Sequence, residues 1–208
     1  MIAALLLAAG ESTRMGQPKA LLPWRGRTLL ESQLAILLAA PLEPVMVVLG
    51  HRADDLRPLL PESPRLQVVL NPRYAEGRST SIAAGAGALP HTTAGAIVAS
   101  VDQPLDPEVL ALMLAAHRDG ASGIIVPSID RRRGHPVLFD ASILPELLSI
   151  TEASEGLRDV LTRHASAIHY VPVTSPLVRL NFNTPAEYQA AFEQFGRAQP
   201  APDRSTQV

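Results

Sequence analysis

The sequence predicts an α/β fold: a doubly wound, mostly parallel sheet with a less regular C-terminal portion. Short apolar runs recur along the first two thirds of the chain. They are continuous rather than alternating, which is typical of strands covered by helices on both faces. Stretches with apolar residues at helical spacing separate the runs, and such strand–helix alternation indicates parallel strands joined by helical crossovers.

The elements follow in order along the chain. Five apolar runs predict buried strands, at 2–8, 45–49, 66–70, 96–101 and 123–126. Four helices are predicted at 28–40, 53–60, 79–89 and 107–118, with Pro41, Pro61, Pro90 and Gly120 as stops. Beyond these, weaker patterns predict a strand at 136–139, a helix at 156–164, a strand at 167–171 and a helix at 185–195.

Length and composition restrict the class of protein. The 208 residues fit a single domain over 1–196, and the polar stretch 197–208 lacks periodicity, so we expect a disordered tail there. A net charge of −2 argues against a nucleic-acid-binding surface, and zero cysteines remove thiolate metal sites and Cys nucleophiles. No run approaches the roughly 20 apolar residues of a membrane span. We expect a cytoplasmic protein without a membrane or nucleic-acid partner.

In doubly wound sheets, ligands bind beyond the carboxyl ends of the strands. The first strand runs into small residues and then a polar loop that carries Arg14 and Lys19. Free N–H groups and two cations in such a loop favour phosphate. The spacing from Gly10 to Gly16 and Lys19 is not that of a Walker A loop, so an ordinary loop with two solvated cations remains the alternative.

Asp102 directly follows the fourth apolar run. A carboxylate at the end of a buried strand is costly unless it pairs with or binds a cation. Magnesium is commonly held by one or two carboxylates together with substrate phosphates. The alternative is a helix cap, for which Asp106 is better placed, directly before Pro107. We therefore interpret Asp102 as a metal ligand.

The segment 71–82 crosses from a strand to a helix rich in small residues and hydroxyls. Asn71 and Gly77 lie in the crossing, and Ser79 and Ser81 open the helix. Ser79 is a suitable N-cap. The same residues could instead contact a ligand, because a helix N-terminus favours anions.

Two further segments are candidates. Arg133, Gly134, His135 and Pro136 form a short basic stretch in which glycine permits close approach of a substrate and His135 could be a general base, a phosphate contact or a structural hydrogen-bonder. In the second, Thr184 and Pro185 fit the start of a helix, and the preceding Asn181 or Asn183 could be a neutral oxygen ligand to a metal.

Taken in this order, the segments resemble the MobA/MocA-like nucleotidyltransferases of molybdenum cofactor biosynthesis. The resemblance runs from Ile2 to about Phe192. Its strongest element is Leu-Ala-Ala-Gly-x-Ser-x-Arg-Met-Gly-x-x-Lys at 7–19, followed by Asp-Gln-Pro at 102–104, Arg-Gly-His-Pro at 133–136 and Asn-x-Asn-Thr-Pro at 181–185. It implies a Rossmann-like nucleotidyltransferase fold and Mg²⁺-dependent transfer of a nucleoside monophosphate from an NTP to a phosphorylated acceptor.

The resemblance also assigns residues. Catalysis would rest on Arg14, Lys19 and Asp102, with Asp102 and Asn181 or Asn183 on the metal. The nucleotide site would comprise Leu7, Ala8, Ala9, Gly10, Arg14, Lys19, Asn71, Gly77, Ser79, Ser81 and Asp102, and the acceptor site Arg133, Gly134, His135 and Pro136. Ala-Ala-Gly at 8–10 resembles the cytidylyltransferases, whereas guanylyltransferases typically show Ala-Gly-Gly, so CTP is the expected donor.

The expected acceptor is molybdopterin, and a molybdenum hydroxylase would be the client. One segment departs from the family, because Ser154 stands where members often carry the Asp of an Asp-x-Gly-x-Arg segment. A guanylyltransferase, or transfer to a sugar or polyol phosphate, is the alternative within this fold. A non-catalytic nucleotide-binding regulatory module is the alternative from another class. The absence of a GxSxG elbow argues against a serine hydrolase.

Overall fold

The structure is a computed structural model, and it describes residues 1–197. Apart from Arg197, the expected tail lies outside these residues. The strands of the main sheet are β1 (Ile2–Ala8), β4 (Val45–Leu49), β5 (Leu66–Leu70), β6 (Gly95–Ser100), β7 (Ile124–Ile129), β8 (Arg132–Arg133), β9 (Val137–Asp140) and β10 (Ile168–Pro172). The α-helices are α1 (Leu29–Ala39), α2 (Ala53–Leu56), α3 (Arg78–Gly87), α4 (Pro107–Arg118), α5 (Leu157–Arg163) and α6 (Pro185–Ala191). None of these helices is long and apolar enough to cross a membrane.

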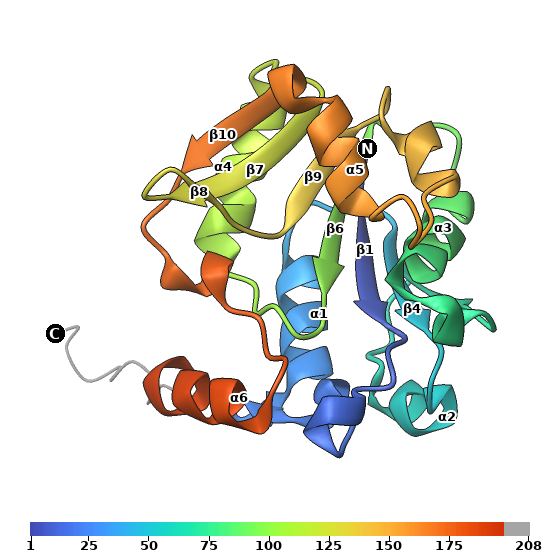
Figure 1. Cartoon of the computed structure of the whole chain (residues 1–208), viewed down its shortest axis with the longest axis vertical. Helices are drawn as coiled ribbons and strands as arrows, with labels where there is room; N and C mark the ends of the chain where they lie inside the picture. The colour runs from blue at the N-terminus through green and yellow to red at the C-terminus, as the bar shows by residue number, and fades with distance from the viewer. Residues whose placement is uncertain (198–208) are drawn as a thin grey trace, which may run out of the picture.

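The sheet is mixed and mostly parallel, in the order β10-β7-β9-β6-β1-β4-β5 (Figure 1). β1 pairs in parallel with both β4 and β6, and β4 pairs in parallel with β5. β9 is inserted antiparallel between β6 and β7. The chain therefore turns one way from β1 to β4 and β5, and returns through α3 to β6 on the other side. This is the switch point at which a crevice opens.

Two apolar clusters cover the two faces of the sheet. Ala4, Leu6 and Ala8 of β1 pack in one cluster with α1 and α4, and Leu5 and Leu7 pack in the other with α3 and α5. In Figure 1, α1 and α4 lie behind the sheet and α3 and α5 before it. The predicted doubly wound architecture is confirmed, since helices pack on both faces of a mostly parallel sheet.

Helix boundaries follow the capping residues. Thr28 and Glu31 form a capping box at the start of α1, and Asp106 accepts from the Glu108 backbone at the start of α4. The helix predicted at 53–60 is shorter than expected: α2 ends at Leu56 and a 3-10 turn, Arg57–Leu59, follows it. Pro58 supplies no backbone N–H for a longer α-helix.

Other features also differ from the expectation: β8 was not predicted, and the helix predicted at 185–195 is α-helical only to Ala191, with a π-helical turn at Phe192–Gly196. β5 is an edge strand with Val68 39% and Leu70 52% exposed, so the prediction that it is buried on both faces is wrong. A hairpin of β2 (Pro23–Trp24) and β3 (Arg27–Thr28) was not predicted. Its turn residues Arg25 and Gly26 both have positive φ, as a tight two-residue hairpin turn requires.

Candidate functional site

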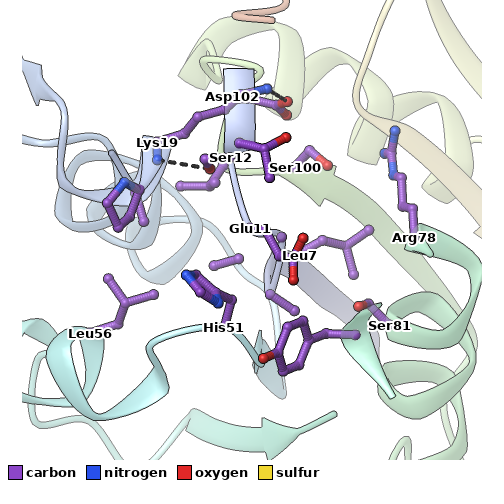
Figure 2. A pocket seen from close by; sticks show the side chains of 18 of the residues that line it. Leu7, Glu11, Ser12, Lys19, His51, Leu56, Arg78, Ser81, Ser100 and Asp102 are labelled. Atoms are coloured by element: carbon purple, nitrogen blue, oxygen red, sulfur yellow. Dashed lines mark hydrogen bonds and ion pairs between the residues drawn. The ribbon is translucent and has the colours of Figure 1, made fainter. Parts of the chain in front are cut away.

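A cavity of about 370 Å³ opens at the carboxyl ends of β1 and β6. Both strands point toward the lower edge of Figure 1, where the first loop and α6 also lie. Figure 2 shows Lys19 and Asp102 at one end of this cavity, His51 at the other, and Arg78 reaching in from the start of α3. Of the predicted nucleotide contacts, the following line it: Leu7, Ala8, Ala9, Gly10, Lys19, Gly77, Ser81 and Asp102.

The first loop presents its backbone to the cavity. Ser12 and Gly16 are both in the left-handed region, with φ of 56° and 68°, and they turn the chain back so that Lys19 N–H donates to Ser12 Oγ at 3.1 Å. A Cβ built on Gly10 would have no atom within 4 Å, and its φ is not positive. The space over Gly10 is therefore open to a ligand.

Lys19 and Asp102 form an ion pair inside the cavity. Lys19 Nζ lies 2.7 Å from Asp102 Oδ2, and the two side chains are 13% and 22% exposed. The same ammonium donates to Asn183 Oδ1 at 3.5 Å. A carboxylate oxygen and an amide oxygen thus converge on one cation, as the oxygens of a Mg²⁺ site would.

The segment that carries Asn183 is fixed on both sides. Phe182 N–H donates to Asp102 O at 3.0 Å, which ties this segment to the end of β6. Glu187 accepts from the backbone of Asn183 and Thr184 at 2.8 and 3.0 Å, and these hydrogen bonds lower the pKa of its carboxyl. Asn181 is exposed and forms no side-chain hydrogen bond among the described residues. The geometry favours Asn183 over Asn181 as a ligand.

Arg14 is separated from Lys19. It lies on a 3-10 turn (Thr13–Met15), is exposed and does not line the cavity. Its charge acts on Glu187, whose pKa it lowers. A triphosphate contact from Arg14 therefore needs a ligand that extends out of the cavity over the first loop.

Two predicted contacts, Asn71 after β5 and Ser79 in the first turn of α3, have protein partners instead. Asn71 is buried, and its Nδ2 donates to Thr80 Oγ1 and Ser81 Oγ at 2.9 Å each. Ser79 is not the N-cap, because the helix begins at Arg78 after Gly77, and its N–H and Oγ both donate to Glu152 Oε1 at 2.7 Å. These hydrogen bonds lower the pKa of Glu152. Neither Asn71 nor Ser79 lines the cavity.

The 133–136 segment lies beside the Asp102 end. Arg133 is exposed and donates from Nε to Tyr170 Oη at 2.9 Å. A Cβ on Gly134 would lie 2.7 Å from Val178 Cβ, so the close approach at this glycine is by Val178, and the expected room for a substrate is not there.

His135 precedes buried Pro136 through a cis peptide bond. Burial is the main cause that lowers its pKa to about 4; Arg78 and Arg179 lower it further, whereas Asp102 opposes the shift. The imidazole is therefore neutral at pH 7 unless a bound anion raises its pKa. Its Nε2 is buried and unpartnered within the described residues.

Several cavity residues had not been predicted. Arg78 lies at the N-terminus of α3 and lines the cavity. Desolvation by the surrounding protein lowers the pKa of its guanidinium, and the carboxylates of Asp102 and Glu152 only partly oppose this shift. His51 and Tyr74 form a T-shaped pair at the far wall, with ring centroids 5.8 Å apart. The Gly77-Arg78 step could have indicated a cation at a helix N-terminus, whereas no local pattern marks His51 or Tyr74.

The oxygen atoms of Asp102 and Asn183 fit a metal ion that binds together with a triphosphate. Among residues 1–197 no three His, Cys, Asp or Glu side chains converge to hold an ion. One carboxylate and one amide oxygen cannot complete the six ligands of Mg²⁺, which typically takes the remainder from phosphates and water. The chemistry of Asp102 and Asn183 therefore fits Mg²⁺ in the presence of a triphosphate.

Known proteins resemble this chain over most of its length. The family model described as the MobA-like NTP transferase domain matches residues 4–168. The chain is 27% identical over 195 residues to molybdenum cofactor cytidylyltransferase of Escherichia coli (strain K12), covering 92% of this chain and 95% of that protein. It is 37% identical over 164 residues to nicotine blue oxidoreductase of Paenarthrobacter nicotinovorans, covering 76% and 79%.

Solved structures share the fold. A nucleotidyl transferase from Methanothermobacter superposes with a TM-score of 0.78 at 25% identity and covers 94% of this chain and 97% of its own. Rv0371c of Mycobacterium tuberculosis, in complex with manganese, gives a TM-score of 0.74 at 24% identity and covers 92% and 97%.

Proposed function

The chain belongs to the MobA-like NTP transferase family, and we propose that it moves CMP from CTP to a phosphorylated acceptor, molybdopterin, with release of pyrophosphate. It is an enzyme of the nucleotidyltransferase class; the nucleotide, the acceptor and Mg²⁺ as the metal are the proposal. The observation that carries it is that Lys19 and Asp102 pair in a cavity lined by the open backbone of the first loop, while Asn183 contacts the same Lys19 ammonium.

In the proposed reaction, a phosphate oxygen of the acceptor attacks the α-phosphorus of CTP, and the bond from that phosphorus to the pyrophosphate oxygen breaks. Asp102 and Asn183 would hold the Mg²⁺ ion, which neutralises charge on the phosphates when bound. Lys19 binds the triphosphate and stabilises charge on the leaving pyrophosphate. No general base is needed, because a phosphate acceptor is ionised at neutral pH, and neutral His135 is left to bind or orient the acceptor.

Arg78 extends this scheme to the acceptor side. Its guanidinium enters the cavity from α3, and its charge acts on both Asp102 and His135. A guanidinium suits a phosphate oxygen through two parallel hydrogen bonds. We assign it to the acceptor phosphate or the α-phosphate, between the metal ligands and the Arg133–Pro136 segment.

The base would lie against Ala9, His51 and Tyr74. The Ala9 methyl is 3% exposed and faces Gly50, where an added Cβ would come within 2.9 Å of it. The methyl is therefore held in place by its neighbours, and a methyl-sized difference beside the base would favour a pyrimidine over the larger guanine by about 1–3 kcal/mol, or roughly 10–200-fold. We predict a preference for CTP over GTP in kcat/KM, which Ala9→Gly weakens without inverting. Equal values, or a GTP preference, in the unmodified protein would contradict this.

One observation favours a second candidate function. The chain is 37% identical to a nicotine blue oxidoreductase, so the second candidate is an oxidoreductase activity. The first loop and the aromatic His51–Tyr74 pair would suit a dinucleotide reductant such as NADH or NADPH. A client molybdenum hydroxylase is expected only under the first function.

Pyrophosphate release separates the candidates when it is measured with each of the four NTPs, with and without purified molybdopterin, beside NADH and NADPH oxidation in a dye-reduction assay. The proposal expects release only with molybdopterin, strongest with CTP. Release strongest with GTP supports a guanylyltransferase, and release that requires a sugar or polyol phosphate supports that alternative. Nucleotide binding without release supports a regulatory module, and dinucleotide oxidation without release supports the oxidoreductase.

A further inference from the structure

A buried glutamine of α1 holds the loop that carries Asp102. Gln33 is 1% exposed, on a helix face that is otherwise leucine, and it does not line the cavity. Its Nε2 lies 3.1, 3.1 and 2.9 Å from the carbonyl oxygens of Ser100, Val101 and Gln103, which share its two N–H donors. Its Oε1 accepts from Leu105 N–H at 3.0 Å.

These four contacts bracket Asp102 in the sequence, at two positions before it and two after. Only one of the two flips of the Gln33 amide forms these hydrogen bonds. The NH₂ group must face the three carbonyl oxygens, and the oxygen must face the Leu105 N–H. A buried amide without partners is costly, and so are buried backbone groups that lose theirs. The loop conformation and the side chain of Gln33 therefore specify each other.

Other contacts hold the loop at different points. Val101 N–H donates to Leu7 O at 3.0 Å, which ties the loop to β1. The backbone carbonyl of Asp102 itself accepts a hydrogen bond from Phe182 N–H at 3.0 Å. Gln33 supplies contacts to both halves of the loop at once, and so fixes the direction in which the Asp102 side chain leaves the backbone.

We propose that Gln33 is a positioning residue for metal binding: it holds the Asp102 carboxylate where, with Asn183 and the triphosphate, it coordinates the ion. The inference rests on the proposed function. Residues that orient metal ligands typically change metal affinity about 10–100-fold when they are replaced. A residue that contributes only to stability changes the free energy of unfolding and leaves metal affinity in the folded protein unaltered.

The test compares Gln33→Met, which keeps the length and removes the amide, with Leu37→Ala on the same helix. Leu37 is fully buried and its side chain is apolar. Its replacement therefore shows how a loss of stability alone changes metal binding. Gln33→Asn, which keeps the amide and shortens its reach by one methylene, is the second variant should Gln33→Met not fold. Mn²⁺ binding is measured by electron paramagnetic resonance with a non-hydrolysable CTP analogue, and the Mg²⁺ concentration for half-maximal activity is measured beside it.

Gln33→Met, or Gln33→Asn in its place, is expected to weaken Mn²⁺ binding and raise the Mg²⁺ requirement by about tenfold or more, with the KM for CTP at saturating metal changed far less. Leu37→Ala is expected to leave both metal readouts unchanged. Metal affinity unchanged in the Gln33 variants, or weakened equally in Leu37→Ala, overturns the role of Gln33. A wild-type protein that binds Mn²⁺ but transfers no nucleotide defeats the proposed function alone, and one that binds no Mn²⁺ defeats both.

Discussion

The ion pair between Lys19 and Asp102 joins side chains 83 residues apart, and it holds the two groups on which the proposed chemistry depends. Its ammonium occupies the space between the oxygens that would face a metal. Metal entry therefore requires Lys19 to move, and the triphosphate offers it new anionic partners. Because Lys19 lies in the cavity and Arg14 lies outside it, we expect their replacement to reduce activity by different amounts.

Lys19→Met is expected to reduce kcat/KM for CTP by about 10²-fold or more, the scale on which removal of an electrostatic contact acts. Arg14→Ala is expected to cost less, about tenfold, because Arg14 is exposed and lies outside the cavity. Steady-state kinetics on the two variants decide this. Equal losses would mean that the triphosphate extends over the Thr13–Met15 turn, and no loss in either would make the loop purely structural.

His135 makes stability depend on pH. Its pKa is lowered from 6.5 to about 4 in the folded protein, so between these values the unfolded chain binds more protons. The free energy of unfolding therefore falls as pH drops from about 6.5 to 4, by about 1–3 kcal/mol from this group.

Urea unfolding of wild type and His135→Gln at a series of pH values measures this contribution. The difference between the two free energies of unfolding is expected to shrink as pH falls through that window, because the other histidines are common to both proteins. A difference that stays constant from pH 7 to 4 would show that His135 titrates normally.

At the scale of elements, the first loop is the part with most room for a ligand. Gly10 has a φ that other residues adopt, and a Cβ there would meet no atom within 4 Å. Gly10→Ala is therefore expected to leave the melting temperature within about 1–2 °C of the wild type. It should still raise the KM for CTP, because the methyl group would stand where the nucleotide approaches the backbone.

Thermal unfolding and nucleotide titration on Gly10→Ala test this. Gly16→Ala is the matched control on the same loop: its φ of 68° is strained for alanine, so it should lose stability, by about 1 kcal/mol. If Gly10→Ala binds CTP normally, the open space over Gly10 is not the nucleotide site.

Elements that follow from local pattern were predicted well. Strands β1, β4 and β5 begin and end where the apolar runs do, and α4 begins at Pro107 after its Asp106 cap. The hairpin at 23–28 was missed because two-residue strands carry too little periodicity to detect. The exposure of β5 was missed because an edge position depends on the order of strands, which no local pattern encodes.

The candidate site was predicted where it lies at strand ends. Asp102 and Lys19 meet in the cavity because parallel strands bring their carboxyl ends to one edge. Asn71 and Ser79 were predicted as ligand contacts, but their polar groups bind Thr80, Ser81 and Glu152. The partner Glu152 is distant in the sequence, so composition alone could not separate a structural hydrogen bond from a ligand contact.

At the scale of the whole molecule, the switch point beside β1 gathers the parts of the site from the full length of the described chain. The first loop, the end of β6 and the start of α3 all line one cavity, and the Asn183 segment reaches it through the contact of Asn183 with Lys19. The account's central claim is that a metal held by Asp102 supports transfer of a nucleotidyl group from CTP at this place.

That claim is tested most directly by following label from [α-³²P]CTP into molybdopterin with wild type and Asp102→Asn, each with and without Mg²⁺. The account predicts that the label moves to the acceptor in wild type only when Mg²⁺ is present. It also predicts that transfer falls about 10²-fold or more in Asp102→Asn, whose melting curve stays cooperative. Label transfer by Asp102→Asn at near wild-type rate, or by wild type without any divalent metal, would contradict it.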